Sequence, residues 1–173
     1  MKKLPHPDNF HLDAATGWLL LGDLEAAKTE LGRLTPVSRE DPSALEVEWD
    51  IDAKVGSWDH AYQVAERLVT GAPDVPFGWI HRAYAARRMP GGGLTQAWHS
   101  LRPAAEKFPN VFLIPYNLAC YAAQMGQAEE AWGWLLRAAK AAGSYSKIKT
   151  MALEDADLKF LWPKIRTDLK PVA

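Results

Sequence analysis

Small and apolar residues recur along the chain at a helical spacing, and the whole pattern repeats. Ala27, Leu31 and Leu34 step by four and then three residues, and a second segment from Ala61 to Leu68 repeats these steps. Residues with this spacing lie on one face of an α-helix. The pattern predicts helices at residues 9–21, 24–36, 43–55, 58–70, 76–89, 94–107, 113–125 and 128–142.

Glycines mark the turns inside four predicted helix pairs. Gly22, Gly56, Gly92 and Gly126 each precede an alanine by five residues, and the glycines are 34, 36 and 34 residues apart. Glycine can adopt the positive φ that such a turn requires. A fixed period of this length is typical of stacked helix hairpins. The sequence therefore predicts a tail at 1–7, four repeats at about 8–41, 42–75, 76–111 and 112–145, and a further segment at 146–173.

These repeats resemble the tetratricopeptide repeat (TPR) family, and in particular its small bacterial-type members. The unit that begins Tyr116-Asn117-Leu118-Ala119 and runs to Ala138 carries the resemblance best. The tryptophan that the family places near the start of a unit is matched only by Trp79, and the insertion at 89–93 lengthens the third turn. The resemblance implies an all-α fold, a right-handed superhelical solenoid of four helix-turn-helix hairpins.

Residues 146–173 lie outside the repeats but keep an amphipathic spacing, for example at Ile148, Leu158 and Ile165. Because an array of hairpins leaves an apolar face on its last unit, it needs a capping element with a polar outer side. We expect this segment to form capping helices, broken near residues 155–157 and at Pro163. A separate binding tail is the alternative.

Composition and charge exclude several classes of function but do not assign one. The 173 residues carry a net charge of −1, which gives no electrostatic case for binding nucleic acid. No apolar run approaches the ~20 residues that span a bilayer, so we expect a soluble, cytoplasmic protein without a membrane partner. The single cysteine, Cys120, and five unpaired histidines give no metal site, and Gly91–Gly93 lacks the context of a phosphate loop. We therefore expect no catalytic, cofactor-binding or metal-binding residue.

The eight tryptophans are assigned to packing, with Trp134 as the one expected to be partly exposed.

The resemblance places the binding groove on the first helix of each unit. Carried across residue by residue, it gives a predicted peptide-binding set of Glu46, Asp50, Phe77, Ile80, Tyr84, Arg87, Arg88 and Tyr116. Charge is segregated along this surface, with seven acids and two bases in 42–75 but one acid and five bases in 76–110. A dipolar surface of this kind can orient an extended ligand, although a solvated face without a ligand is the alternative.

Three functions remain open on this evidence. The first is a scaffold or adaptor that holds a peptide or partner segment in the concave groove. The second is a small secretion-type chaperone, which would dimerise and suppress the aggregation of a client. An enzyme is the least favoured, because no triad, metal cluster or phosphate motif is present. The partner and the oligomeric state are left open by the sequence.

Overall fold

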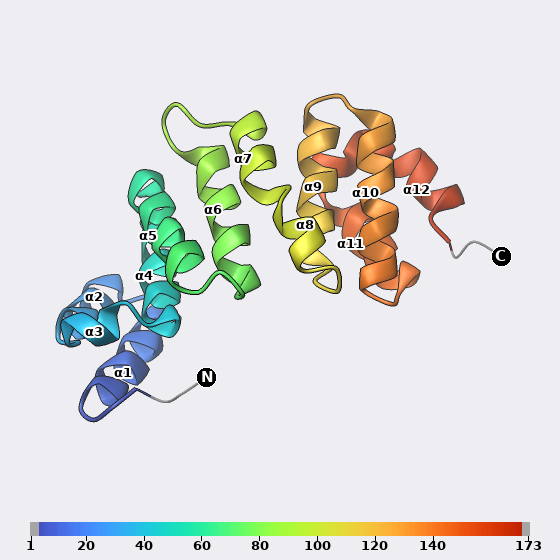
Figure 1. Ribbon diagram of the computed structural model, residues 1–173. Helices are drawn as coiled ribbons and strands as arrows, with labels where there is room; N and C mark the ends of the chain where they lie inside the picture. The colour runs from blue at the N-terminus through green and yellow to red at the C-terminus, as the bar shows by residue number, and fades with distance from the viewer. Residues whose placement is uncertain (1–3, 171–173) are drawn as a thin grey trace. The chain divides into compact units, whose positions relative to one another are not determined.

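The structure is a computed structural model that describes residues 4–170, and this part of the chain is helical and contains no strand (Figure 1). The chain divides into two compact units, Met1–Pro90 and Gly91–Ala173. The first unit contains α1 (Asp8–Leu21), α2 (Leu24–Gly32), α3 (Pro36–Arg39), α4 (Pro42–Val55), α5 (Trp58–Gly71) and α6 (Pro76–Arg88). The second contains α7 (Leu94–Leu101), α8 (Ala104–Lys107), α9 (Leu113–Gln124), α10 (Ala128–Ala141), α11 (Tyr145–Glu154), the 3₁₀ helix η1 (Ala156–Leu161) and α12 (Trp162–Asp168). Among residues 4–170, no helix combines the length and the apolar character that crossing a bilayer would require.

Helices that follow each other in the chain pack as neighbouring pairs, as the repeat predicts. In the first unit α1 packs on α2, α4 on α5, and α5 on α6, while in the second α9 packs on α10. The recurring alanines Ala27, Ala61 and Ala131 lie in these paired helices and are completely buried, at 0% exposure, and Ala97 on α7, which packs on α9, is buried to the same extent. A methyl group at this position lets two helix backbones approach closely while larger neighbours fill the flanks.

The turns confirm the predicted role of glycine in three of the four repeats. Gly22, Gly56 and Gly126 adopt φ of 83°, 76° and 77°, in the left-handed region where a Cβ would be strained. In the third repeat the positive φ occurs at Gly91 and Gly93 rather than at Gly92. The inserted residues there change which glycines make the turn.

Two predicted helices are shorter than expected, and proline is the cause in both. The helix expected over 24–36 ends at Gly32, because Thr35 precedes Pro36 and takes an extended conformation, with ψ of 154°. The helix expected over 94–107 is divided into α7 and α8 around Pro103, which has no N–H to donate to the helix ladder.

Trp134 corrects a prediction about exposure. Its side chain is buried at 5% exposure, with its ring edge-on to that of Trp98. The guanidinium carbons of Arg102 and Arg137 lie 5.0 and 4.4 Å from the centroid of its ring. Cations on the ring exclude solvent from a tryptophan that would otherwise face it. Trp18, at 40%, is instead a tryptophan that is exposed.

The segment after the repeats packs against the last helix pair. α11 packs on α10, η1 packs on α9, and α12 packs on α11 and η1. Leu158, Leu161 and Ile165 are buried at 3% exposure or less, and the Trp162 Nε1 donates to the carbonyl of Ala152 at 2.8 Å. The expected break at 155–157 is present, whereas Pro163 lies in the first turn of α12 and does not interrupt it. The termini of the predicted tail and cap, at 1–3 and 171–173, lie outside the described residues.

Gly78 tests the close approach of α5 and α6. A Cβ at Gly78 would lie 2.9 Å from the Cβ of Leu68 and 3.2 Å from the backbone nitrogen of Val69. We expect Gly78→Ala to lower the free energy of unfolding by about 1–3 kcal/mol, because the two helices must separate. Gly133→Ala in α10 is the control, since a Cβ there meets nothing within 4 Å, and we expect it to stabilise by about 0.5–1 kcal/mol. Urea denaturation measures both, and equal effects would contradict the packing.

Leu158 tests whether the C-terminal segment is part of the folded core. Leu158 is fully buried, so Leu158→Ala should cost about 2–5 kcal/mol through lost burial and a residual cavity. Phe160 in the same 3₁₀ helix is 56% exposed, and Phe160→Ala should change stability by less than about 0.5 kcal/mol. Thermal melts of the two variants distinguish the cases. A mild Leu158→Ala would favour the alternative of an independent tail.

Candidate functional site

The predicted binding residues divide between the two units. Glu46 and Asp50 lie on α4, and the set from Phe77 to Arg88 lies on α6, all within the first unit. Tyr116 lies on α9 in the second unit. On α6, Phe77 and Tyr84 are exposed at 49% and 38%, while Ile80, Arg87 and Arg88 are partly buried. Glu46 is also partly buried, and Asp50 is exposed.

Aromatic side chains from three helices meet around α6. The ring of His81 stacks on the ring of Trp49 from α4, with centroids 3.9 Å apart and planes 13° apart. Tyr84 lies 5.9 Å from both Trp49 and Trp58, and Phe77 lies 5.9 Å from His81. We call Trp49, Trp58, Phe77, His81 and Tyr84 the aromatic cluster. It presents two exposed rings, Phe77 and Tyr84, on a base of partly or fully buried ones.

Arg88 covers one side of the cluster. Its guanidinium carbon lies 3.4 Å from the centroid of the Tyr84 ring and 5.3 Å from that of Trp58, and its Nη1 donates to the carbonyl of Tyr84 at 3.2 Å. A guanidinium that stacks over aromatic faces is held in place by them and remains positively charged. Arg88 is therefore a positioned cation beside exposed aromatic surface.

His81 is held neutral inside the cluster. Burial lowers its pKa from the ordinary 6.5 to about 4, because the charged imidazolium would lose its hydration there. A neutral ring stacks between Trp49 and Phe77 without placing a second positive charge next to Arg88. At physiological pH the positive charge held against the cluster by Arg88 is therefore not joined by one from His81.

Glu46 and Asp50 carry negative charge on the neighbouring helix. They lie four residues apart and so share one face of α4, and Glu46 is three residues before Trp49 and therefore beside it on the helix surface. Desolvation raises the pKa of Glu46, and the charges of Asp50 and Asp41 raise it further. Desolvation also raises the pKa of Asp50, an effect that Lys54 partly offsets. Among residues 4–170, neither carboxylate has an ion-pair or hydrogen-bond partner.

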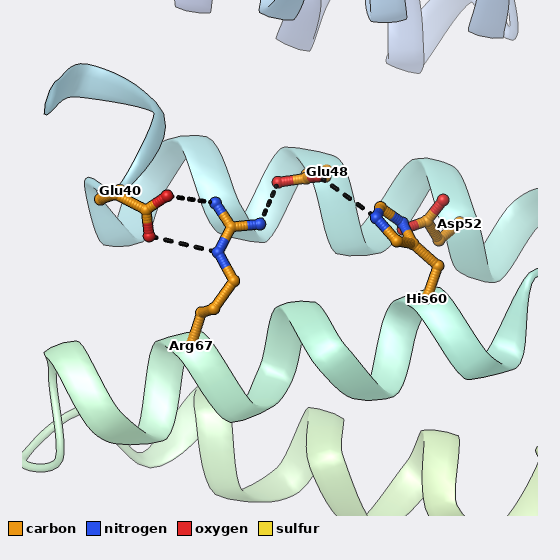
Figure 2. Close-up of polar contacts among 5 residues, drawn as sticks. All are labelled: Glu40, Glu48, Asp52, His60 and Arg67. Carbon is orange, nitrogen blue, oxygen red and sulfur yellow. Dashed lines mark hydrogen bonds and ion pairs between the residues drawn. The ribbon is translucent and has the colours of Figure 1, made fainter. Parts of the chain in front are cut away.

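The other flank of α4 carries carboxylates that are fully paired, as Figure 2 shows. Arg67 on α5 donates two hydrogen bonds to Glu40, at 2.6 and 3.2 Å, and one to Glu48 at 3.2 Å. The Nδ1 of His60 lies 2.6 Å from Asp52, and its Nε2 lies 3.9 Å from Glu48. Bidentate arginine pairs of this kind fix geometry as well as charge. This network clamps α5 to α4 and to the segment before it.

A pocket of about 260 Å³ opens beside this network. Its apolar wall comes from α2, α4 and the loop between them, and its polar rim includes Glu48, Asp52 and His60. The rim carboxylates are already satisfied by Arg67 and His60. Across the described part of the chain, no group of three His, Cys, Asp or Glu side chains is arranged to hold a metal ion.

Tyr116 lies against the C-terminal segment rather than on an open surface. It is 6% exposed, and its hydroxyl donates to Asp155 Oδ2 at 3.1 Å. Cys120 Sγ lies 3.5 Å from the same oxygen, and Gln124 on the next turn of α9 donates to the carbonyl of Asp157 at 3.2 Å. Desolvation and the nearby acids raise the pKa of Tyr116 far above its usual value. This face of α9 is occupied by the chain itself.

Sequence reasoning missed the stacked pair beneath the exposed rings. Trp49 packs in the core, as the sequence predicts, but its stack with His81 beneath Phe77 and Tyr84 is not predicted. A signal was present, because Phe77, His81, Tyr84 and Arg88 follow one another by four, three and four residues and share a helix face. The partner on α4 could not be found this way, since it depends on how two helices pack.

Comparison with known proteins finds similarity at the level of structure only. No protein-family model matches the chain, and no curated protein sequence matches it. Among solved structures, the chain is similar to TTC0263, a thermophilic TPR protein of Thermus thermophilus, with a TM-score of 0.66 and 19% sequence identity. The similarity covers 92% of this chain and 98% of that one. It confirms the helix-pair repeat architecture that the glycine period predicts.

His81 makes stability depend on pH in a defined window. Because its pKa is about 4 in the folded chain and near 6.5 when unfolded, the unfolded chain takes up this proton first. The free energy of unfolding should therefore fall as the pH drops from about 6.5 to about 4, by roughly 3 kcal/mol at most. His81→Phe keeps a ring that can stack on Trp49 but removes the imidazole, and with it this pH-dependent contribution to the free energy of unfolding. Urea denaturation between pH 7.5 and pH 4 should show a smaller decline for the variant, and parallel curves would contradict the assignment.

Proposed function

We propose that this chain, which has the tetratricopeptide-repeat fold, is a non-enzymatic interaction module that binds an extended segment of a protein partner. The surface that supports this proposal consists of the aromatic cluster with Arg88 on one side and Glu46 and Asp50 on the other. We propose that it works in the cytoplasm as a scaffold or adaptor. Fold alone does not dictate function, so the argument rests on the chemistry of this surface.

The single observation that carries the proposal is the exposure of Phe77 and Tyr84 on a rigid aromatic base. Aromatic and arginine side chains most often supply the binding energy of protein interfaces, because they bury much area with few rotatable bonds. The stack of Trp49 on His81 already fixes the base before a ligand arrives. Less ordering is then needed on binding, which favours affinity.

Charge defines which ligand fits. Glu46 and Asp50 are partly desolvated and have no ion-pair partner among the described residues, so a lysine or arginine of the ligand would neutralise them. Arg88, with Arg87 beside it in the sequence, suits an acidic side chain or a carboxylate at the other end. The ligand is therefore an apolar segment with a basic residue toward α4 and an acidic group toward the end of α6. Ile80 remains a predicted contributor, whereas Tyr116 is 6% exposed and bonded to Asp155, so we leave it out of this surface.

A small secretion-type chaperone is the second candidate. Exposed apolar side chains, such as Phe77 in the first unit and Phe160 in the second, suit a client that is not fully folded. A chaperone of this kind would lower the light scattering of an aggregating client at stoichiometric amounts, whereas an adaptor would bind one short segment and leave aggregation unchanged.

Selection from a phage-displayed library of random peptides tests the proposal. We expect enriched sequences to combine a basic residue with aromatic or aliphatic residues, because these complement Glu46, Asp50 and the exposed rings. For a synthetic copy of an enriched peptide, Tyr84→Ala should weaken binding by about thirty-fold and the Arg87→Glu/Arg88→Glu pair by at least about ten-fold, with little change in melting temperature. Fluorescence anisotropy measures the affinities.

Matched controls lie in the second unit. Phe160→Ala removes an aromatic ring that is 56% exposed, and Arg166→Glu reverses an exposed arginine, so neither should alter peptide binding. Glu46→Lys/Asp50→Lys used as the selection target should reverse the charge of the enriched peptides. If Tyr84→Ala and the arginine pair both bind unchanged, the surface on α4 and α6 is not the binding site.

A further inference from the structure

The base of the aromatic cluster carries hydrogen-bonding groups that the fold does not use. Among residues 4–170, neither ring nitrogen of His81 has a hydrogen-bond partner. The Nε1 of Trp49, in the ring stacked on it, is buried and has no partner either, whereas the nitrogens of His81 are open to solvent. A polar group left without a partner in a partly buried position needs an explanation, and a ligand that supplies the partner is one.

His81 lies between the two exposed rings of the cluster. It is four residues after Phe77 and three before Tyr84, so the three side chains share one face of α6. A segment that covers both exposed rings must therefore pass over the imidazole. Because burial keeps His81 neutral at physiological pH, its ring carries one N–H donor. The segment that fits this surface needs a backbone acceptor that is free of hydrogen bonds of its own.

The spacing of the exposed rings selects among ligand conformations. Phe77 and Tyr84 are seven residues apart, which places them about 10.5 Å apart along the same face of α6. A β-strand presents side chains on one side at about 6.7 Å and then at about 13.4 Å, so it matches neither ring when it covers the other. A polyproline II helix presents side chains on one side every three residues, about 9.3 Å apart. Its repeat therefore matches the two rings to within about 1 Å.

An α-helical ligand matches the same spacing but not the hydrogen bonding. Residues seven apart on such a ligand repeat the distance of about 10.5 Å, yet its carbonyls are bonded inside the helix and would leave the N–H of His81 without an acceptor. The carbonyls of a polyproline II segment are free, because this conformation has no internal hydrogen bonds. Proline also has no N–H, so a proline-rich segment brings acceptors and no donors. It therefore complements a base whose unused groups include the N–H groups of Trp49 and His81.

We infer that the partner segment of this surface is a proline-rich polyproline II helix. Two of its apolar residues, three positions apart, contact Phe77 and Tyr84, and a backbone carbonyl between them accepts from the imidazole of His81. This inference rests on the proposed function, because it names the class of ligand for the same surface. Aromatic-lined grooves are suited to such segments, since a polyproline II helix is stiff before it binds and loses little conformational entropy.

The charges beside the rings set the positions of charged residues in the segment. Arg88 is four residues after Tyr84, about 6 Å further along α6, which two residues of polyproline II span. An acidic residue two positions beyond the apolar residue on Tyr84 therefore reaches Arg88. The positions between the two apolar residues project to the sides of the segment, and on one side α4 carries Glu46 and Asp50. A lysine or arginine belongs at one of these positions.

Fluorescence anisotropy of labelled synthetic peptides with the full chain tests the inference. The first probe is a proline-rich peptide with two leucines three residues apart, a lysine between them and an aspartate two residues after the second leucine. One comparison peptide has the same composition with the leucines two residues apart, and the other is an alanine-based helix with the leucines seven residues apart. We expect the first probe to bind in the micromolar range, at least about ten-fold more tightly than either comparison peptide. Tyr84→Ala should weaken its binding by about thirty-fold, and Phe160→Ala should leave it unchanged.

Removal of single carbonyls from the probe separates the hydrogen bond from the apolar contacts. Alkene isosteres replace the three peptide groups between the leucines, one at a time. One of these replacements should weaken binding to the wild-type chain by about five-fold, because it removes the acceptor of His81. The same replacement should not change binding to His81→Phe, which has no donor to lose. If all three replacements leave wild-type binding unchanged, the inferred hydrogen bond is wrong.

The outcomes also distinguish this inference from the proposed function. If peptides from the random library bind through Tyr84 while the proline-rich probe does not bind, the inference is overturned and the surface on α4 and α6 stands as a binding site. Tighter binding of the helical peptide, or of the peptide with leucines two residues apart, would overturn it in the same way. Binding of the proline-rich probe that Tyr84→Ala leaves unchanged would place its site elsewhere and would also overturn it.

Discussion

Close contact between paired helices at a recurring alanine is the constraint on which the rest of the structure depends. Ala27, Ala61, Ala97 and Ala131 are fully buried one repeat apart, and at Gly78 even a methyl group is too large. Helices that approach this closely have no room for large side chains between their backbones. Trp49 packs in the same buried cluster as Ala61, while Phe77 and Tyr84 remain exposed above it.

The helices and turns could be predicted because local rules govern them. The apolar period and the glycine turns at Gly22, Gly56 and Gly126 depend only on nearby residues, and the structure agrees with them. The two shortened helices show the limit of periodicity, since Pro36 and Pro103 override an apolar pattern that continues past them. In the first helix of the second repeat the opposite occurs. Glu48 and Asp52 interrupt the apolar pattern, yet α4 continues through them, and Arg67 and His60 on α5 pair with them.

The site could be predicted only as far as one helix face. The residues from Phe77 to Arg88 lie on one helix, so their spacing along α6 was enough to group them. The Trp49–His81 stack joins two helices whose packing no local pattern reports, and the burial of Tyr116 depends on Asp155, which lies 39 residues away. The burial of Trp134 depends in part on such a contact, because Arg102, 32 residues away, covers its ring together with Arg137 on the same helix. Contacts between residues far apart in the sequence decide which aromatic side chains remain exposed to a ligand.

The acids of α4 show how one helix can serve both the fold and the ligand. Glu48 and Asp52 on one flank have partners within the chain, since Glu48 accepts from Arg67 and Asp52 lies 2.6 Å from the Nδ1 of His60. Burial raises the pKa of Glu46 and of Asp50 on the other flank, neither forms an ion pair among the described residues, and Lys54 offsets the effect at Asp50 only in part. A cation of another molecule could stabilise the ionised form of these two carboxylates. This carboxylate pair, which the fold compensates only in part, therefore supports our proposal that the ligand carries a basic group.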